Sequence, residues 1–375
     1  MINYIAILYT RFLTKLDRFS QMKNWQIKLS LVLFVYILFV AFPSFDLLHK
    51  DFAGGWTILF RHADHLLTPV PYAPESHEAK LAFRLLIPVI VRLFHLNMLG
   101  VLLFQFLAGW VSWILFMKII EKFTGDKITA AILALAMACI NFSKCTLDIR
   151  GVFFDNIAFL FLLIPFVYTR SIIIFICITL AAWIDERAFV ASSFLFLFLL
   201  FNRHEKNSVL KIASVVMAWI GYIGLRYYLS QTYHLSTPTT GAGFTTIIAQ
   251  MNNWHLGIIS GLEGFWIFPL LFILYKIKER KWLEAVVFSA NILVIILIAL
   301  SVVDISRSMS YLFISIPLVI QYLSQKESIS DLRKIAAIAL VLSFLFPAYY
   351  FSSVRESYWS YPLPLQIIRI FFVSS

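Results

Sequence analysis

The residues best suited to chemistry gather in one polar stretch near the start of the chain, between Pro43 and Leu96. It holds carboxylate, imidazole and guanidinium side chains, namely Asp46, His49, Asp51, Arg61, His62, Asp64, His65, Glu75, His77, Glu78 and Arg84. The stretch separates two long apolar runs, and it is far longer than a turn between two membrane helices requires. Because long loops are usually functional, we predict that it is the catalytic loop of a membrane enzyme.

The histidines of this stretch are candidate metal ligands. His62 and His65 are three residues apart and would share one face of a helix, and His77 follows with Glu78. Imidazole and carboxylate groups bind divalent metals, but the spacing supplies no defined third ligand. The alternative is a surface loop that holds histidines without a metal. A divalent cation is therefore one option, and the sequence requires no cofactor.

A second group of charged residues lies at or inside the ends of later apolar runs. Its members are Asp148, Arg150, Asp155, Asp185, Glu186, Arg187, Arg226, Glu263, Asp304 and Arg307. Ionisable groups within a membrane are costly, and they usually face a cavity or pair with one another. We therefore predict a water-filled polar cavity that opens on one side of the membrane.

The composition indicates that the solvent of this chain is lipid. Of its 375 residues, 61% are hydrophobic and only 14% are charged, whereas about a quarter are charged in an average soluble domain. The mean hydropathy is +0.85. The chain has only three cysteines, Cys139, Cys145 and Cys177, which indicates neither a disulfide framework nor a thiolate metal site. We expect an all-α integral membrane protein.

Eleven apolar segments follow one another along the chain. They lie near residues 27–44, 97–118, 128–142, 152–168, 171–183, 188–202, 212–228, 257–275, 285–303, 308–323 and 335–351. They predict about eleven transmembrane helices in one polytopic domain, residues 27–351, with residues 43–96 as a long first outer loop. Several segments are shorter than the roughly 20 residues that cross a bilayer. The polar groups that shorten them lie on the side where we expect the cavity.

The distribution of basic residues predicts the orientation of the chain. With the N-terminus inside, the excess of Lys and Arg falls wholly on the inner side, as the positive-inside rule requires. The net charge of +11 is therefore a topology signal and no evidence of nucleic-acid binding. We expect a bacterial inner membrane, a cytoplasmic N-terminus and an outward-facing polar stretch.

Three further regions flank or interrupt the predicted helices. Apolar residues recur at helical spacing within residues 1–26, at Ile5, Leu8, Phe12, Leu16 and Phe19. This pattern predicts a helix lying on the anionic inner leaflet, and a basic leader that only sets topology is the alternative. Residues 229–256 form a second outer loop and residues 352–375 an outer tail.

Four short motifs lie at the ends of the apolar segments. They are Lys50-Asp-Phe-Ala-Gly-Gly-Trp-Thr-Ile-Leu59, Ala82-Phe-Arg-Leu-Leu-Ile-Pro-Val-Ile90, Gly151-Val-Phe-Phe-Asp-Asn-Ile-Ala158 and Ile184-Asp-Glu-Arg-Ala-Phe189. Together they resemble the GT-C class of polytopic glycosyltransferases, whose members take sugars from polyprenyl-phosphate donors. The resemblance covers the first six segments and extends to Arg307-Ser-Met-Ser-Tyr311. The chain departs from it at Gly54-Gly55, where family members commonly carry an aromatic residue.

The resemblance implies transfer of a sugar, with inversion, from a polyprenyl-phosphate donor to a lipid-linked or cell-envelope glycan on the outer side. Asp51 would be the general base that takes the proton of the acceptor hydroxyl. The glycines after it would let a substrate approach the backbone closely. The structural alternative is that Asp51 caps a helix starting at Phe52. Asp46 and Asp64 are the alternative bases.

The charged groups near the later segments complete the implied site. Arg84, Arg187 and Arg307 are candidates for binding the donor phosphate, because guanidinium forks match phosphate oxygens. The remaining candidates would line the cavity, namely Asp148, Arg150, Asp155, Asp185 and Glu186. Structural ion pairs, such as Asp185 with Arg187 or Asp304 with Arg307, are the alternative.

Two other functions fit a polytopic protein of this composition. A transporter or flippase of lipid-linked glycans would need access from both leaflets, and the one-sided polar groups disfavour it. A glycan polymerase normally has its large loops later in the chain, whereas here the largest loop comes first. The expected partners are a polyprenyl-phosphate sugar, a glycan or lipid acceptor and membrane lipids.

Overall fold

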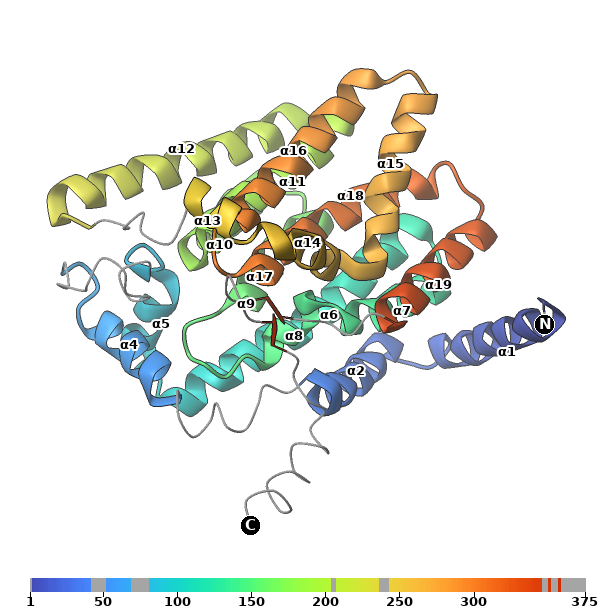
Figure 1. Cartoon of the computed structure of the whole chain (residues 1–375), viewed down its shortest axis with the longest axis horizontal. Helices are drawn as coiled ribbons and strands as arrows, with labels where there is room; N and C mark the ends of the chain where they lie inside the picture. Colours follow the sequence, from blue (N-terminus) through green and yellow to red (C-terminus); the bar gives the residue numbers. More distant parts are fainter. Residues whose placement is uncertain are drawn as a thin grey trace, which may run out of the picture.

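The computed structural model of the chain describes residues 2–41, 52–68, 81–203, 207–235, 243–345, 350–351 and 357–358. These residues are almost entirely helical (Figure 1), apart from one antiparallel pair of two-residue strands, β1 (Tyr350–Phe351) and β2 (Ser357–Tyr358). The helices up to residue 233 are α1 (Ile2–Ser20), α2 (Trp25–Ala41), α4 (Phe52–Asp64), α5 (Leu86–Phe94), α6 (Met98–Thr124), α7 (Lys127–Cys139), α8 (Asn141–Lys144), α9 (Asp155–Val167), α10 (Ser171–Ile184), α11 (Glu186–Phe201) and α12 (Ser208–Tyr233).

The remaining helices are α13 (Phe244–Ala249), α14 (Trp254–Leu262), α15 (Ile267–Lys278), α16 (Trp282–Leu300), α17 (Ile305–Met309), α18 (Ser315–Ser324) and α19 (Ile329–Leu345). Short 3₁₀ segments join some of them, namely η2 (Cys145–Leu147), η3 (Met251–Asn253), η4 (Glu263–Trp266) and η5 (Ser310–Ile314). Within the described residues, each of the eleven predicted apolar segments overlaps helical structure, and the last of them, 335–351, extends beyond the end of α19 and includes β1.

Among the described residues, four helices are long and apolar enough to cross a membrane: Met98–Thr124, Ser208–Tyr233, Met251–Lys278 and Trp282–Leu300. A fifth arises if Lys127–Cys139 and Asn141–Leu147, which meet at a bend of 73°, count as one broken span. Shorter apolar helices are Trp25–Phe39, Asp155–Val167 and Ser171–Ile184. The all-helical fold and its apolar helices are therefore confirmed, whereas the count of about eleven spans stays a prediction.

The long apolar helices expose large hydrophobic side chains on their outer faces. Leu103 of α6, Met217 of α12 and Leu283 of α16 are each more than half exposed. Exposed apolar patches of this extent mark contact with a membrane or a partner. Together with the lengths of the helices, they identify the chain as an integral membrane protein.

Aromatic rings fill the centre of the helical bundle. The ring of Phe142 lies 4.0 Å from that of Phe313 and 4.7 Å from that of Phe159, measured between centroids. Phe116 lies 4.9 Å from Phe313, and Phe159 lies 4.7 Å from Tyr311. Such tilted and stacked pairs are favourable. They fix α6, α8, α9 and η5 to one another, and so position the start of α9 beside the segment that carries Arg307.

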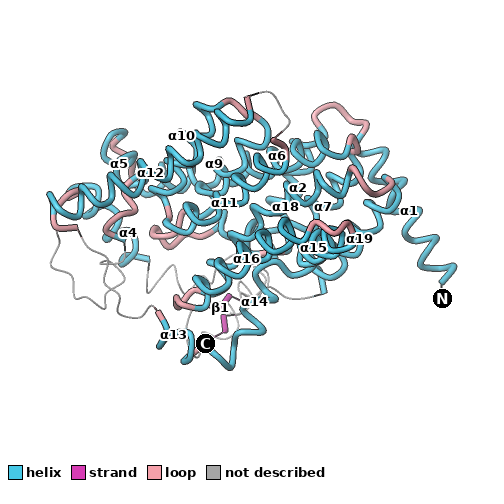
Figure 2. The backbone as a smooth tube through the Cα atoms, turned by 90° about the horizontal axis from the view of Figure 1, so that it is seen from above, coloured by secondary structure: helices cyan, strands magenta, loops and turns pink. Residues whose placement is uncertain are grey.

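Helix α1 and the helices of the first loop lie at opposite ends of the molecule. In both Figure 1 and Figure 2, α1 extends from one end, and α4 and α5 lie at the other. Helix α1 contacts α7 and α2, and it exposes Tyr4, Ile7 and Leu8. The expected helix within residues 1–26 is thus present, and its place on the inner leaflet stays a prediction.

The first loop docks on the bundle through α4. The indole Nε1 of Trp56 donates a hydrogen bond of 3.0 Å to the carbonyl oxygen of Ile149. A Cβ on Gly55 would lie 1.9 Å from the carbonyl oxygen of Arg150. Gly151, at φ +77°, approaches the Trp56 ring so closely that a Cβ there would lie 2.6 Å from it. The close approach that Gly55 permits is therefore made by the protein's own backbone, whereas Gly54 has open space around it.

Candidate functional site

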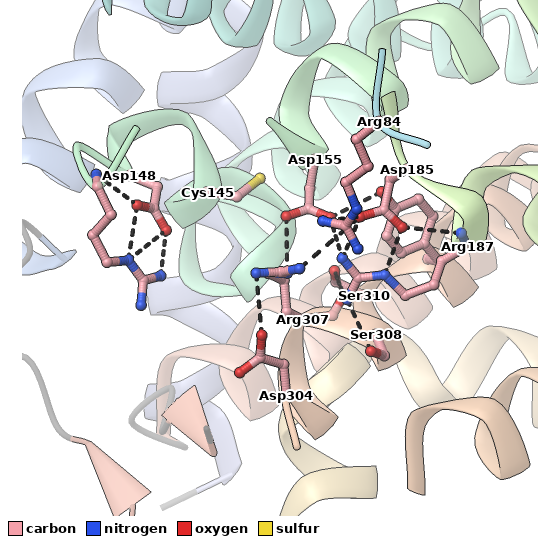
Figure 3. A network of polar contacts seen from close by, with 12 residues as sticks. Arg84, Cys145, Asp148, Asp155, Asp185, Arg187, Asp304, Arg307, Ser308 and Ser310 are labelled. Atoms are coloured by element: carbon pink, nitrogen blue, oxygen red, sulfur yellow. Dashed lines mark hydrogen bonds and ion pairs between the residues drawn. The ribbon is translucent and has the colours of Figure 1, made fainter. Parts of the chain in front are cut away.

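Three arginines and two aspartates from distant parts of the chain meet at one end of the bundle (Figure 3). They are Arg84, Asp155, Asp185, Arg187 and Arg307. Asp185 lies between α10 and α11, Asp155 begins α9, Arg307 belongs to α17, and Arg84 precedes α5. We call these five residues the buried charge cluster. All five were predicted site residues, and the fold brings them together.

Asp185 and Arg187 form the local part of the cluster. Asp185 is the N-cap of α11, and its Oδ1 accepts hydrogen bonds from the backbone N of Arg187 at 2.9 Å and from its Nε at 2.7 Å. The Nη2 of Arg187 lies 2.5 Å from the second carboxylate oxygen. An N-cap aspartate satisfies an orphan helix donor, and the two-pronged contact holds the guanidinium plane in one orientation.

Asp155 joins two arginines to a tyrosine. Its Oδ1 accepts hydrogen bonds from Arg187 Nη2 at 3.0 Å and from the Tyr311 hydroxyl at 2.9 Å. Its Oδ2 lies 3.1 Å from Arg307 Nε. Asp155 lies in the first turn of α9, where the helix dipole favours an anion. A carboxylate with an exposed fraction of only 1% needs such partners, because an unpaired buried charge is costly.

Arg307 has the least complete hydrogen bonding in the cluster. Its Nη1 lies 3.1 Å from Asp304, and its Nη2 lies 3.9 Å from Asp185. The guanidinium also stacks on the ring of Phe153, at 3.7 Å from the centroid. Within the described part of the chain, however, Nε and Nη1 make no aligned hydrogen bond. Both atoms therefore pair with carboxylates electrostatically without an aligned hydrogen bond.

Arg84 connects the first loop to the cluster. Its Nη1 lies 2.9 Å from Asp185, and its Nε lies 3.2 Å from Glu186. Glu186 follows Asp185 in the chain, and its side chain is 38% exposed. Arg84 is thus fixed by a buried carboxylate on one side and by a solvent-accessible one on the other. Residues separated by about a hundred positions are coupled in this way.

A small cavity lies beside Arg84, between the first loop and the start of α9. Its volume is about 20 Å³, enough for about one water molecule, and its lining includes His62, Arg84, Gly151 and Phe154. Burial lowers the pKa of His62 to about 4. The imidazole is therefore neutral near pH 7, and it adds no charge beside Arg84.

Asp148 and Arg150 lie apart from the buried charge cluster and pair with each other. The Oδ1 of Asp148 accepts hydrogen bonds from Arg150 N at 3.1 Å and from its Nε at 2.9 Å. Arg150 lies 4.4 Å from the ring centroid of Phe153, the ring on which Arg307 also stacks. Phe153 thus lies between this partly buried pair and Arg307 of the cluster.

Two buried amides that the sequence reasoning missed hold this region in place. Gln105 Nε2 donates to the carbonyl oxygen of Asp148 at 2.6 Å and to that of Cys145 at 3.2 Å. Asn156 Nδ2 in turn donates to the carbonyl oxygen of Gln105 at 2.6 Å. The available signal was a polar amide within an apolar helix, which is uncommon without a partner.

The sequence reasoning missed the polar contacts that two residues near Arg307 make with the cluster. The Tyr311 hydroxyl donates a hydrogen bond to Asp155, and Ser308 Oγ accepts a hydrogen bond of 2.9 Å from Arg187 Nη1. The pairing of Asp304 with Arg307, in contrast, was one of the ion pairs that the sequence suggested. The motif around Arg307 drew attention to the segment. It did not show which of its side chains face the cluster, because that depends on how α17 and η5 pack.

The candidates of the first loop are placed only in part. Asp51, Asp46 and His77 lie outside the described residues, and α4 begins at Phe52, directly after Asp51. Asp64 and His65 are exposed at the end of α4. In the part of the chain that the structure covers, no group of three or more His, Cys, Asp or Glu side chains could hold a metal ion.

No family model, no curated protein and no solved structure matches the chain.

Proposed function

We propose that this chain is a membrane glycosyltransferase that moves a sugar from a polyprenyl-phosphate donor to a lipid-linked or cell-envelope glycan. The observation that carries the proposal is the convergence of Arg84, Arg187 and Arg307 at one end of an apolar helical bundle. A planar guanidinium group can bind two oxygens of one phosphate at the same time. A phosphate held at the end of the bundle leaves its lipid chain alongside apolar helices.

The balance of charge within the cluster supports an anionic ligand. Three guanidinium groups face only two fully buried carboxylates, Asp155 and Asp185. The other two partners, Glu186 and Asp304, have side chains that are 38% and 20% exposed. Exposed ion pairs contribute little free energy. A donor phosphate would therefore replace the exposed Glu186 at small cost.

The reaction needs a base and a stabilised leaving group. The acceptor hydroxyl attacks the anomeric carbon, the bond from that carbon to the phosphate oxygen breaks, and polyprenyl phosphate leaves with the bonding electrons. We assign Asp51, which immediately precedes α4 in the sequence, as the base that takes the proton of the acceptor hydroxyl. The arginines would stabilise the negative charge on the leaving phosphate, an effect that is often the largest in such reactions.

Transfer from a synthetic polyprenyl-phosphate sugar, measured with the protein in lipid nanodiscs, tests both assignments. We expect Asp51→Asn to keep the fold and to lower kcat by about a hundredfold or more, as loss of a general base does. Asp64→Asn, in the same loop, should retain normal turnover. Arg307→Lys keeps the charge but loses the planar fork, so it should raise KM for the donor.

Three results would count against the proposal. The first is normal turnover of Asp51→Asn, and the second is loss of folded Arg307→Lys without a change in KM of the remaining folded protein. The third is movement of the donor across the bilayer without release of polyprenyl phosphate, which would indicate a flippase.

A further inference from the structure

A second polar pocket lies at the ends of four helices, away from the buried charge cluster. Its volume is about 640 Å³, and its walls come from the C-terminal ends of α11, α15 and α18 and from the start of α16. This size is within the range of ligand sites in proteins. Asn202 and Gln321 form part of the wall and are joined by a hydrogen bond of 2.9 Å from Asn202 Nδ2 to Gln321 Oε1.

Three helices connect this pocket to the cluster and place the two at opposite ends of the bundle. Asp185 precedes α11 and Arg203 follows it, whereas Asp304 follows α16 and Lys281 precedes it. Arg307 likewise lies before α18, and Lys326 lies after it. With 16 residues in α11 and 19 in α16, the separation is about 24–28 Å. In Figure 1 the connection between α15 and α16 lies towards the same end as α1. The pocket is therefore at the inner membrane surface if the cluster is at the outer one.

Basic side chains dominate the lining of the pocket. Among its described residues are Arg203, Lys276, Lys281 and Lys326, against the single carboxylate of Glu284. Glu279, beside the pocket, pairs with Lys281 at 3.1 Å and with Lys326. Among the described residues in and beside the pocket, four cations and two carboxylates leave a surplus of two positive charges, which favours an anionic ligand.

Lys276 is a buried cation at the base of the pocket. Its exposed fraction is 4%, and its Nζ lies 2.6 Å from Glu284 and 4.0 Å from the ring centroid of Tyr322. The rings of Phe272 and Phe201 lie 5.1 and 5.5 Å from the same atom. Contacts with aromatic faces stabilise an ammonium group. The fold thus holds a positive charge inside the pocket, rather than only around its rim.

The mouth of the pocket is apolar where the helices face outward. Leu200, Leu283 and Val287 line it, and each of them is exposed. A soluble anion has no use for these side chains, whereas the acyl chains of a lipid would lie against them. A polar, basic interior next to an exposed apolar mouth matches the two parts of a phospholipid.

From this arrangement we infer that the pocket binds the phosphate-bearing head group of an anionic phospholipid of the inner leaflet. Basic pockets between membrane helices on the inner side are suited to such head groups. The lipid would be a resident of this end of the bundle, distinct from the donor at the cluster. Lipid binding at the pocket therefore does not depend on the proposed reaction at the cluster.

Thermal unfolding of the full chain in nanodiscs tests this inference. The nanodiscs would contain either phosphatidylcholine alone or phosphatidylcholine with phosphatidylglycerol, and a detergent sample would receive inorganic phosphate. We expect phosphatidylglycerol to raise the Tm and inorganic phosphate to leave it unchanged. The apparent affinity for phosphatidylglycerol is read from native mass spectrometry of detergent-purified protein.

A pair of matched variants separates the pocket from the general charge of the surface. Arg203→Gln combined with Lys281→Gln removes two cations of the pocket, and each is worth about fivefold in binding to anionic lipid, so affinity should fall about 25-fold. Lys278→Gln combined with Arg280→Gln removes two exposed cations from the adjacent turn. This control should change the affinity for anionic lipid by less than about twofold.

Equal losses of affinity for phosphatidylglycerol in the two double variants would overturn the inference, because they would indicate diffuse electrostatic attraction to the leaflet. Unchanged affinity in the pocket variant would overturn it as well. Stabilisation by inorganic phosphate as strong as that by phosphatidylglycerol would identify a soluble anion in place of a lipid. If the pocket variant does not fold, equal Tm values of the unmodified protein in the two kinds of nanodisc would be decisive against it.

Discussion

At the scale of single residues, Asp155 is one of the two carboxylates that hold the buried charge cluster together. This carboxylate contacts Arg187, Arg307 and Tyr311 and is nearly inaccessible to solvent. Asp304 contacts Arg307 from the rim and is more exposed. The two aspartates therefore differ in burial while sharing one partner, and this allows a matched comparison.

We predict that Asp155→Asn destabilises the folded protein by about 3–5 kcal/mol, because it leaves two buried guanidinium groups without their shared carboxylate. Asp304→Asn should cost less than about 1 kcal/mol, as expected of a partly exposed pair. The free energy of unfolding in detergent is the quantity to measure. Similar costs for the two variants would mean that burial does not govern the cluster.

At the scale of elements, the docking of α4 decides how the first loop meets the bundle. Gly55, Trp56 and Gly151 form this contact, and His62 lies farther along the same helix, beside Arg84. The loop is thus partly built from helices and packs on the segment of residues 149–152.

Gly55→Ala should displace α4, because its Cβ would lie 1.9 Å from the carbonyl oxygen of Arg150, a backbone atom. Overpacking of this kind typically costs about 1–3 kcal/mol. Gly54→Ala, with nothing within 4 Å of its Cβ, should instead be neutral or should stabilise the helix by up to about 1 kcal/mol. Tm measurements on both variants check this. An unchanged Tm in Gly55→Ala would contradict the observed docking of α4.

The burial of His62 predicts that α4 is less stable in acid. In the unfolded chain the imidazole takes up a proton near its ordinary pKa of 6.5, whereas in the folded chain it does so only at about pH 4. Stability is therefore complete above pH 6.5 and declines as the pH falls from 6.5 to 4, by up to about 1 kcal/mol per pH unit. The decrease in Tm between pH 7 and pH 5 should be smaller in His62→Gln. An identical decrease would assign the acid sensitivity to other groups.

At the scale of the whole molecule, α4 and α5 lie at one end and α1 lies at the other. The charge distribution of the sequence places α1 in the cytoplasm. If both hold, the buried charge cluster faces outward and the basic pocket faces inward.

Cysteine labelling of intact cells tests this orientation. We expect His65→Cys, at an exposed position directly after α4, to react with an impermeant maleimide from outside. Lys278→Cys, exposed at the end of α15, should react only after permeabilisation. The natural cysteines are all buried and should give little background. The reverse pattern would invert the topology and the proposed location of the site.

The positions of the apolar helices could be predicted from the sequence alone. Hydropathy is a local property, so the apolar run that became α16 or α12 could be predicted without knowing its neighbours. The Asp185–Arg187 pair was also foreseen, because two residues at the start of one helix are close in any fold. For the same reason, a helix starting at Phe52 could be proposed from the residues around it.

Only the tertiary structure decided which distant charges meet. Asp155 contacts Arg307 across 152 positions of sequence. The sequence suggested Asp304 as a partner of Arg307, but it did not show that Arg307 pairs with both aspartates. The roles of Gly55 and Gln105 likewise became visible only when α4 and α6 were packed against residues 145–150. Charge, size and hydrogen-bonding capacity can be read from each residue type. Pairing also requires the distances between helices, which the packing of side chains such as Phe142 and Phe313 sets throughout the bundle.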